Sequence, residues 1–184
     1  MHYFIGDLGH LFVITSFVSA ILATYAFFQA QKQDSDWKRF SKLLFYVHAV
    51  SIIGVCVTLF LIIHNHYFEY HYAYNYTSKI LPYYYQISSF WNGQEGSFLL
   101  WMFWNVILGL IIIHTNKKWK APVMTVFAFT QIFLTSMILG VVIFNVKIGS
   151  SPFILLRDAV QDPIFSMNPD FVPQDGRGLN PLLQ

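Results

Sequence analysis

The chain has 184 residues, of which 55% are hydrophobic and only 11% are charged, and its mean hydropathy is +0.49. Because a soluble domain carries about 25% charged residues, this composition excludes an ordinary soluble domain and predicts an all-α integral membrane protein. The formal net charge of +2 is too small for a nucleic-acid-binding surface. The single cysteine, Cys56, excludes an internal disulfide and a Cys-x-x-Cys motif.

Four apolar runs are long enough to cross a bilayer, which takes about 20 helical residues. None contains Asp, Glu, Lys or Arg, and they predict transmembrane helices over about 8–29, 43–64, 97–114 and 122–146. In lipid these runs should be helical because each backbone polar group must be satisfied within its own segment. We therefore expect a four-helix transmembrane region over 1–146 and a separate tail over 147–184.

Lysine and arginine gather in the first and third connections between these helices. These residues are Lys32, Lys38, Arg39 and Lys42 in the first connection and Lys117, Lys118 and Lys120 in the third. The long second connection, 65–96, contains only Lys79. The positive-inside rule places the two basic connections in the cytoplasm, so the N-terminus, the 65–96 segment and the tail should lie on the outer face.

The outer connection is rich in tyrosine: Tyr67, Tyr70, Tyr72, Tyr74, Tyr76, Tyr83, Tyr84 and Tyr85. Tyrosine suits a membrane interface, with its ring among the headgroups and its hydroxyl in water, so an aromatic belt is the simplest interpretation. The tail contains Pro152, Pro163, Pro169, Pro173 and Pro181. These prolines predict an outer loop, with a short amphipathic helix around 153–160.

Within the four runs, small or polar side chains indicate how helices meet. The first run offers Ser16, Ser19, Ala20 and Ala23 as a face for close helix contact. Asn105 and Gln131 lie in apolar surroundings and should hydrogen-bond to neighbouring helices, as packing contacts rather than as catalysts.

The chain has seven histidines, whose imidazoles can bind a metal or a haem iron. His10 and His64 both fall near the outer membrane face and could be two axial ligands of one haem iron. His48 and His114 lie nearer the cytoplasmic side and should be wetted helix ends. The sequence has no zinc spacing, P-loop, Gly-x-Ser-x-Gly or dinucleotide motif, so we identify no catalytic constellation.

The segment that opens the third run is unusual. A polar string, Trp-Asn-Gly-Gln-Glu-Gly-Ser, begins at Trp91 and leads into the apolar run that contains Trp101. Taken singly, the two tryptophans are interfacial anchors, Glu95 is a charge favoured at a helix N-terminus, and Ser97 is an N-cap. A transmembrane helix has no general need for the whole string, which therefore indicates a function.

This string resembles the signature Trp-Gly-x-x-Glu-Gly-Ser-Leu-Leu-Leu-Trp of the CcmF-type cytochrome c biogenesis proteins. They are haem-handling proteins of the bacterial inner membrane and are related to the CcmC and CcsA group. The family's upstream Leu-Pro-x-x-Tyr corresponds to residues 81–85, and its Glu-Gly-Arg-x-Leu-Asn-Pro-Leu-Leu-Gln is similar to residues 175–184. Asn92 and Phe98 depart mildly from the pattern. The family is much longer, so the resemblance implies an N-terminal portion or one piece of a split protein.

The resemblance implies a haem lyase that delivers haem to apocytochrome c on the outer face. The implied partners are lipid, a haem chaperone, apocytochrome c and other cytochrome c maturation subunits. The implied cofactors are substrate haem and a b-type haem whose ligands lie outside this chain. The residues that match the family motifs are Trp91, Gly93, Glu95, Gly96, Ser97 and Trp101, as the candidate cofactor-binding set, and Gly176, Arg177, Asn180 and Pro181 in the tail. Because Glu95 would repel a haem propionate, we expect an architectural role for it.

Two other classes of function remain open. A transporter or channel subunit could use the Trp91–Trp101 segment as an outer vestibule, although the absence of charged residues and internal prolines from the four runs disfavours it. A non-catalytic scaffold of a maturation complex would co-purify with partners but without haem.

Overall fold

The computed structural model describes residues 2–32, 34–115, 119–143, 146–160, 162–168 and 170–179. Four helices in these ranges are long and apolar enough to cross a membrane: α1 (Tyr3–Ala30), α2 (Ser35–His64), α5 (Gly93–Thr115) and α6 (Lys120–Leu139). The shorter elements are α3 (His71–Tyr76), α4 (Tyr83–Ser89), β1 (Val141–Ile143), β2 (Val146–Ile148), α7 (Leu156–Ala159) and α8 (Pro163–Met167). The predicted class, a helical integral membrane protein that crosses the bilayer several times, is confirmed.

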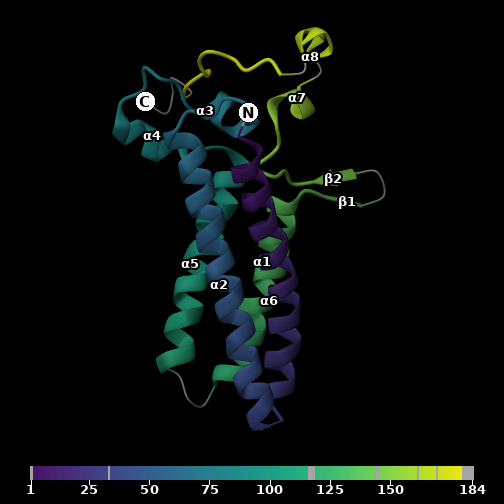
Figure 1. The fold of residues 1–184 in the computed structure, drawn as a ribbon. Coiled ribbons are helices and arrows are strands. Elements are labelled where there is room, and N and C mark those ends of the chain that lie inside the picture. The colour runs from purple at the N-terminus through teal and green to yellow at the C-terminus, as the bar shows by residue number, and fades with distance from the viewer. Residues whose placement is uncertain are drawn as a thin grey trace.

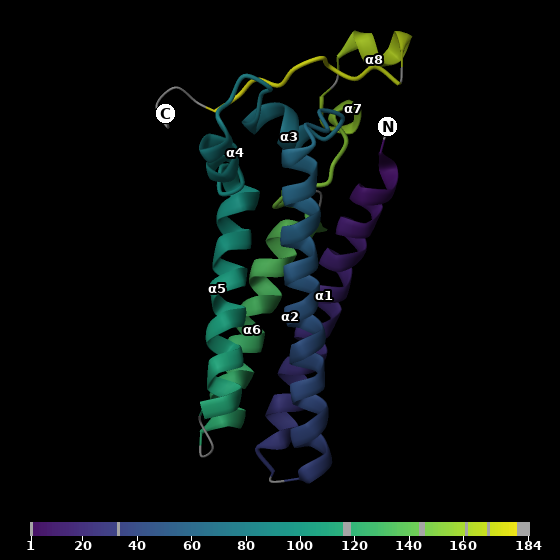
Figure 2. The ribbon, with the colours of Figure 1, turned by 60° about the vertical axis from the view of Figure 1, so that its left-hand side comes forward.

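The four long helices form an elongated bundle, seen from two sides in Figures 1 and 2. Helix α1 packs against α2 and α6, whereas α5 packs mainly against α6. The small residues predicted to line α1, including Ser16, Ala20 and Ala23, are buried. They let neighbouring helices approach closely, which is how helices associate in lipid.

All the short helices lie at one end of this bundle. The N-terminus, α3, α4, α7 and α8 lie together there, while the C-terminus of α1 and the N-terminus of α6 lie at the other end (Figure 1). The described part of the tail runs back across the outer end towards α4 (Figure 2). Residues far apart in the sequence therefore meet at one end of the bundle, which we call the outer end.

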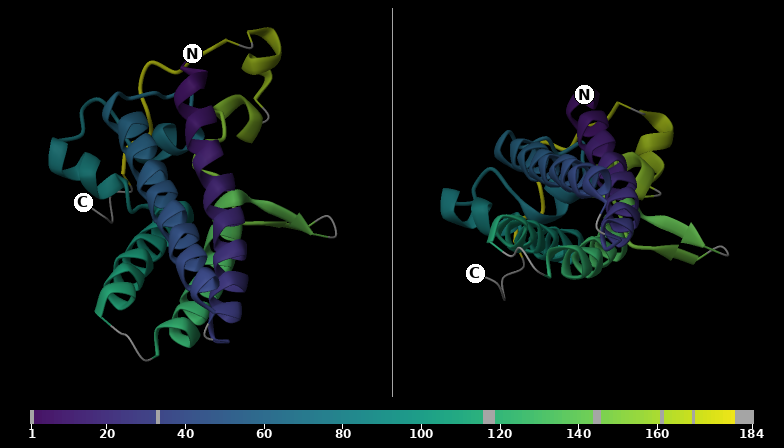
Figure 3. Two further views of the ribbon diagram at one scale, coloured as in Figure 1. Left: turned by 60° about the horizontal axis from the view of Figure 1, so that its bottom comes forward. Right: turned by 90° about the horizontal axis from the view of Figure 1, so that it is seen from below.

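The helix boundaries differ from the sequence expectation most at the start of α2 and at the end of α6. Helix α2 begins at Ser35 rather than 43, because the Asp34 side chain accepts a 2.9 Å hydrogen bond from the Asp36 backbone and caps the polar first turn. The expected helix over 122–146 is wrong beyond Leu139. Gly140, with φ of +72°, ends α6 in the left-handed conformation. The chain then forms the antiparallel β1–β2 hairpin, which projects away from the bundle (Figure 3).

The hydrophobic core divides into two clusters. The larger cluster lies towards the outer end, and the smaller one lies towards the opposite end of the bundle. In the smaller cluster the fully buried Phe45 of α2 packs beside α5 at Gly109. A Cβ atom added at Gly109 would lie 2.5 Å from the tip of the Phe45 ring. Helix α5 can therefore approach α2 this closely only because Gly109 has no side chain.

We expect Gly109→Val to lower the stability of the bundle by about 1–3 kcal/mol, because overpacking forces buried neighbours to move. Leu108→Val is the matched control, since Leu108 is 50% exposed. Thermal unfolding of the detergent-solubilised protein measures both. Equal midpoints for the two variants would contradict this packing.

Candidate functional site

The outer end is organised around α3, a short helix between two larger structures. Its residues Tyr72 and Ala73 are buried, at 2% and 0% exposure. On one side it meets the segment that joins α4 to α5, and on the other it meets the returning tail. These two neighbours carry the two sequence motifs identified above.

Tyr72 attaches α3 to the first motif. Its hydroxyl oxygen lies 2.6 Å from the carbonyl oxygen of Asn92, to which it donates, and 3.1 and 3.0 Å from the carbonyl oxygens of Ser89 and Phe90. These carbonyls lie at and just beyond the C-terminus of α4, where a helix leaves its last carbonyls without intrahelical partners, and the Ser89 carbonyl also accepts from the Asn92 N–H at 3.2 Å. Burial raises the pKa of the Tyr72 hydroxyl well above its usual range, and the Glu95 carboxylate acts in the same direction. The hydroxyl therefore keeps its proton and remains a donor.

The two glycines of the motif are required because the tyrosines of α3 approach the backbone closely at these positions. Gly93 has a φ of +69°, and a Cβ there would lie 2.5 Å from the Tyr76 hydroxyl. A Cβ at Gly96 would lie 2.5 Å from both the Phe90 carbonyl oxygen and the Tyr72 hydroxyl. The tyrosines of α3 thus occupy the space that side chains at these two positions would need.

Glu95 and Ser97 belong to the first turns of α5 rather than to the preceding loop. The Ser97 hydroxyl donates a 2.8 Å hydrogen bond back to the Gly93 carbonyl, so its predicted role as an N-cap is wrong. The helix starts earlier than expected because Gly93 can adopt a positive φ at that point. Glu95 is half-buried in the first turn, where the helix dipole favours a carboxylate. Its charge acts on Tyr72 and Tyr76, whose pKa values are raised first by burial and then by this carboxylate.

The tryptophans of the motif face outwards. Trp91 is 40% exposed and Trp101 is 60% exposed. Trp91 packs edge-on against Phe90, and Trp101 against Phe98. The motif therefore has an inner part, bound to α3, and two aromatic rings available to lipid, ligand or protein.

The tail motif binds the other side of α3. The backbone N–H groups of Arg177 and Gly178 donate to the carbonyls of Tyr74 and Thr77, at 2.7 and 3.1 Å. A Cβ at Gly176 would lie 2.1 Å from the Thr77 carbonyl oxygen. The Arg177 guanidinium lies 5.4 Å from the centre of the Tyr74 ring, a cation–π contact. Two predicted tail residues, Asn180 and Pro181, lie outside the described ranges.

Asp175 fixes the turn that precedes this contact. One of its carboxylate oxygens accepts hydrogen bonds from the backbone N–H groups of Lys79, at 2.9 Å, and Gly176, at 2.8 Å. The other accepts from the Ser78 hydroxyl at 3.3 Å. The Lys79 backbone bond is the main cause that lowers the pKa of this carboxyl below its usual range.

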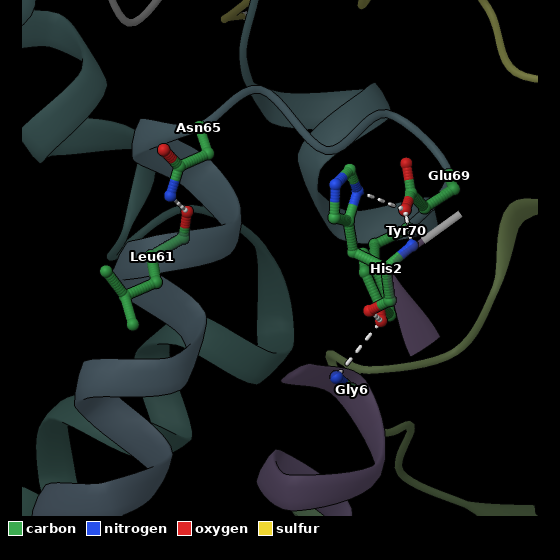
Figure 4. A network of polar contacts seen from close by, with 6 residues as sticks. All are labelled: His2, Gly6, Leu61, Asn65, Glu69 and Tyr70. Atoms are coloured by element: carbon green, nitrogen blue, oxygen red, sulfur yellow. Dashed lines mark hydrogen bonds and ion pairs between the residues drawn. The ribbon is translucent and has the colours of Figure 1, made fainter. Parts of the chain in front are cut away.

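A third contact ties the N-terminus to the segment before α3 (Figure 4). The Tyr70 hydroxyl donates to the His2 carbonyl at 2.8 Å and accepts from the Gly6 backbone at 3.0 Å. The buried Glu69 carboxylate accepts from the His2 backbone and lies 3.2 Å from its ring Nδ1. Burial raises the pKa of Tyr70 to about 12. The aromatic-belt interpretation is therefore wrong for Tyr70 and Tyr72, although it remains a prediction for the exposed Tyr83 and Tyr84.

The two candidate haem ligands face different elements. His10 lines an open cavity of about 440 Å³ between α1 and the 153–158 segment, and its Nδ1 lies 3.4 Å from the Ser151 hydroxyl. His64 stacks on Phe60 and meets the edge of Tyr83 on α4. Within the described ranges no group of three His, Cys, Asp or Glu side chains could hold a metal ion. His10 and His64, which contact different elements, therefore do not fit as a pair of axial ligands for a resident haem.

Comparisons with known proteins agree with the motifs. Over 98% of its length the chain is 28% identical to the cytochrome c-type biogenesis protein CcmF of Haemophilus influenzae, of which it covers 26%. It is 30% identical to the protein of the same name from Pseudomonas fluorescens, again over 98% of this chain and 25% of that protein. No protein-family model matches.

The fold is similar to that of a solved cytochrome c heme lyase CcmF, with a TM-score of 0.71 and 19% identity over 90% of this chain and 27% of that one. The chain thus spans about a quarter of the length of the relatives it matches. The resemblance predicted from the sequence motifs is confirmed.

We expect Tyr72→Phe to destabilise the outer end by about 1–3 kcal/mol, because the carbonyls around the end of α4 lose the hydrogen bonds from the Tyr72 hydroxyl. Tyr84→Phe, which removes the same atom from a side chain that is 64% exposed, should have little effect. Hydrogen exchange at residues 83–96 measures the difference. Unchanged exchange in Tyr72→Phe would show that this hydroxyl does not hold the segment.

The tail should detach from α3 at acidic pH. Because the pKa of Asp175 is lowered in the folded state, its contribution is complete at neutral pH and is lost as the pH falls below about 4 and through the lowered value. The protection of the Arg177 and Gly178 amides, relative to their intrinsic exchange rates at each pH, should then fall in the wild type more steeply than in Asp175→Asn, which is loosened at every pH. Asp170→Asn, an exposed carboxyl in the same tail, is the control and should behave as the wild type.

Proposed function

We propose, from the premise that the chain is a CcmF-type N-terminal portion, that it builds the outer end of a membrane haem lyase system for cytochrome c maturation. The whole system would deliver haem to apocytochrome c. Its expected partners are a haem chaperone, apocytochrome c and other maturation subunits of the membrane. The role proposed for this portion is architectural, and the ligands of a b-type haem would come from elsewhere in the full system.

One observation carries the proposal: both family-like motifs bind the same short helix. Tyr72 and Tyr76 of α3 meet the first motif at Asn92, Gly93 and Gly96. Tyr74 and Thr77 receive the tail motif through two backbone hydrogen bonds. A motif that served only haem contact would not need its inner residues to match α3 so closely.

The outer end would face away from the cytoplasm. The opposite end of the bundle carries Lys32, Lys38, Arg39 and Lys42, and the positive-inside rule favours the cytoplasm for these residues. In a bacterial inner membrane the outer end would then meet the compartment in which c-type cytochromes are assembled. This orientation puts the N-terminus and the tail on the extracytoplasmic side.

The motif residues would divide into two roles. Gly93, Gly96 and Ser97 shape the start of α5, and Glu95 stabilises its first turn. Trp91 and Trp101 are the members whose rings are exposed. Haem is a flat apolar substrate with two carboxylates, so aromatic faces such as Trp91, beside the exposed Tyr83 and Tyr84, are the candidates for contact with it.

A scaffold without haem contact is the second candidate, and the same engagement of the motifs with α3 favours it. It differs from the first in one respect. A scaffold needs the fold of the outer end but not the exposed rings. Co-purification of maturation partners without haem would support it.

Two neighbouring substitutions in the full-length gene test the proposed role. Gly96→Ala should lower protein level and holocytochrome c together, because the added methyl group overpacks the contact with Phe90 and Tyr72, at a cost of about 1–3 kcal/mol. Glu95→Gln should largely keep both. The measurements are haem staining of c-type cytochromes and immunodetection of the protein in a deletion strain that carries each variant.

Two outcomes would contradict the proposal. If Glu95→Gln keeps the protein level but abolishes holocytochrome c, Glu95 takes part in haem chemistry and the architectural role is wrong. If the deletion strain still makes normal holocytochrome c, the assignment to cytochrome c maturation is wrong.

A further inference from the structure

A histidine lies in the interior of the bundle, far in the sequence from both motifs. The sequence suggested that His48 of α2 is a wetted helix end, but its side chain is fully buried. It lies between Ser16 of α1 and Gln131 of α6, with the Phe45 ring 5.9 Å away. None of these neighbours carries a charge. An ionisable side chain in such a place is unusual and calls for a partner.

The tautomer of His48 follows from its bond to α1. Nδ1 lies 2.9 Å from the Ser16 carbonyl oxygen. A carbonyl only accepts, so Nδ1 must carry the hydrogen. In the neutral ring Nε2 is therefore an acceptor.

The orientation of the Gln131 amide follows in the same way. Its nitrogen donates to the Met102 carbonyl at 3.0 Å and to the Asn105 side-chain oxygen at 3.2 Å. Since the Met102 carbonyl cannot donate, the amide cannot be reversed. The Gln131 oxygen is thus left as an acceptor, and the Gln131 side chain is a neighbour of the His48 ring.

Two buried acceptors therefore belong to neighbouring side chains. Among the described residues neither His48 Nε2 nor Gln131 Oε1 has a hydrogen-bond partner. They cannot satisfy each other in the neutral state, and an unsatisfied buried acceptor costs free energy. A single added donor between them would satisfy both atoms.

We propose that His48 and Gln131 form an internal site for one hydrogen-bond donor between α2 and α6. The donor is either a proton bound to Nε2 or a water molecule that donates one hydrogen to each acceptor. The bound proton would create an imidazolium without a neighbouring carboxylate, whereas water adds no charge. In both cases the site links α1 and α2 to the α5–α6 pair through one set of hydrogen bonds.

The two sources are distinguished by ¹⁵N NMR of the full-length protein in lipid bilayers, with labelled histidine. The signals of His48 are assigned by their loss in His48→Gln. Protonation of both ring nitrogens identifies the proton. A protonated Nδ1 with an unprotonated Nε2 that is hydrogen-bonded to exchangeable water identifies the water.

Two other spectra would overturn the proposal: an Nε2 without any hydrogen bond, or a ring protonated only at Nε2. Gln131→Met removes one acceptor at similar volume, so it should move the Nε2 signal and leave Nδ1 in place. Thr130→Val, on the exposed face of the same helix, should move neither. If Nε2 is unaffected by Gln131→Met, Gln131 is not part of the site.

Discussion

The outer end depends on one constraint, which is the shortage of hydrogen-bond donors where α4 ends and α5 has not yet begun. The carbonyl groups at that point are buried or half-buried, and of the three that Tyr72 reaches, the Ser89 carbonyl also accepts from the Asn92 backbone N–H at 3.2 Å. The Tyr72 hydroxyl lies within 3.1 Å of three of them. It can do so only because Gly96 has no side chain to keep α5 away. The phenol of α3 and the glycines of the motif therefore form one unit, and the entry angle of α5 into the membrane follows from it.

The same helix then fixes the tail. Once Tyr72 and Tyr76 are held against the first motif, the carbonyls of Tyr74 and Thr77 point towards the opposite side, where Arg177 and Gly178 bind. Glu69 and Tyr70, directly before α3, bind the N-terminus. Three segments that are remote in the sequence are thus positioned by about ten consecutive residues. In lipid the long helices can slide or tilt at modest cost, so a polar clamp at one end is an effective way to fix their relative positions.

The membrane region was predictable because length and hydropathy alone decide it. That Asn105 and Gln131 form hydrogen bonds between helices was also predictable, because an amide in apolar surroundings needs a polar partner. That they bond to each other, at 3.2 Å, is shown only by the structure. The β1–β2 hairpin was not, because residues 141–146 are as apolar as the helix before them and only Gly140 marks the change. The inward tyrosines were missed for a different reason. A tyrosine at an interface and one that binds buried carbonyls have the same sequence signal, and only the position of the glycines opposite Tyr72 and Tyr76 distinguishes them.

The candidate site was predicted as a string of residues but not as a division of roles. The sequence motif alone does not show that Trp91, Glu95 and Trp101 have different roles. In the structure the glycines and the serine make contacts within the chain, whereas the tryptophans are exposed. Residues that hold the fold tolerate little change in the shape of their side chains. Exposed rings that bind a flat ligand tolerate a change of shape, but they do not tolerate the loss of the aromatic face. Substitutions that preserve shape and those that preserve only aromatic character therefore separate the two roles within one motif.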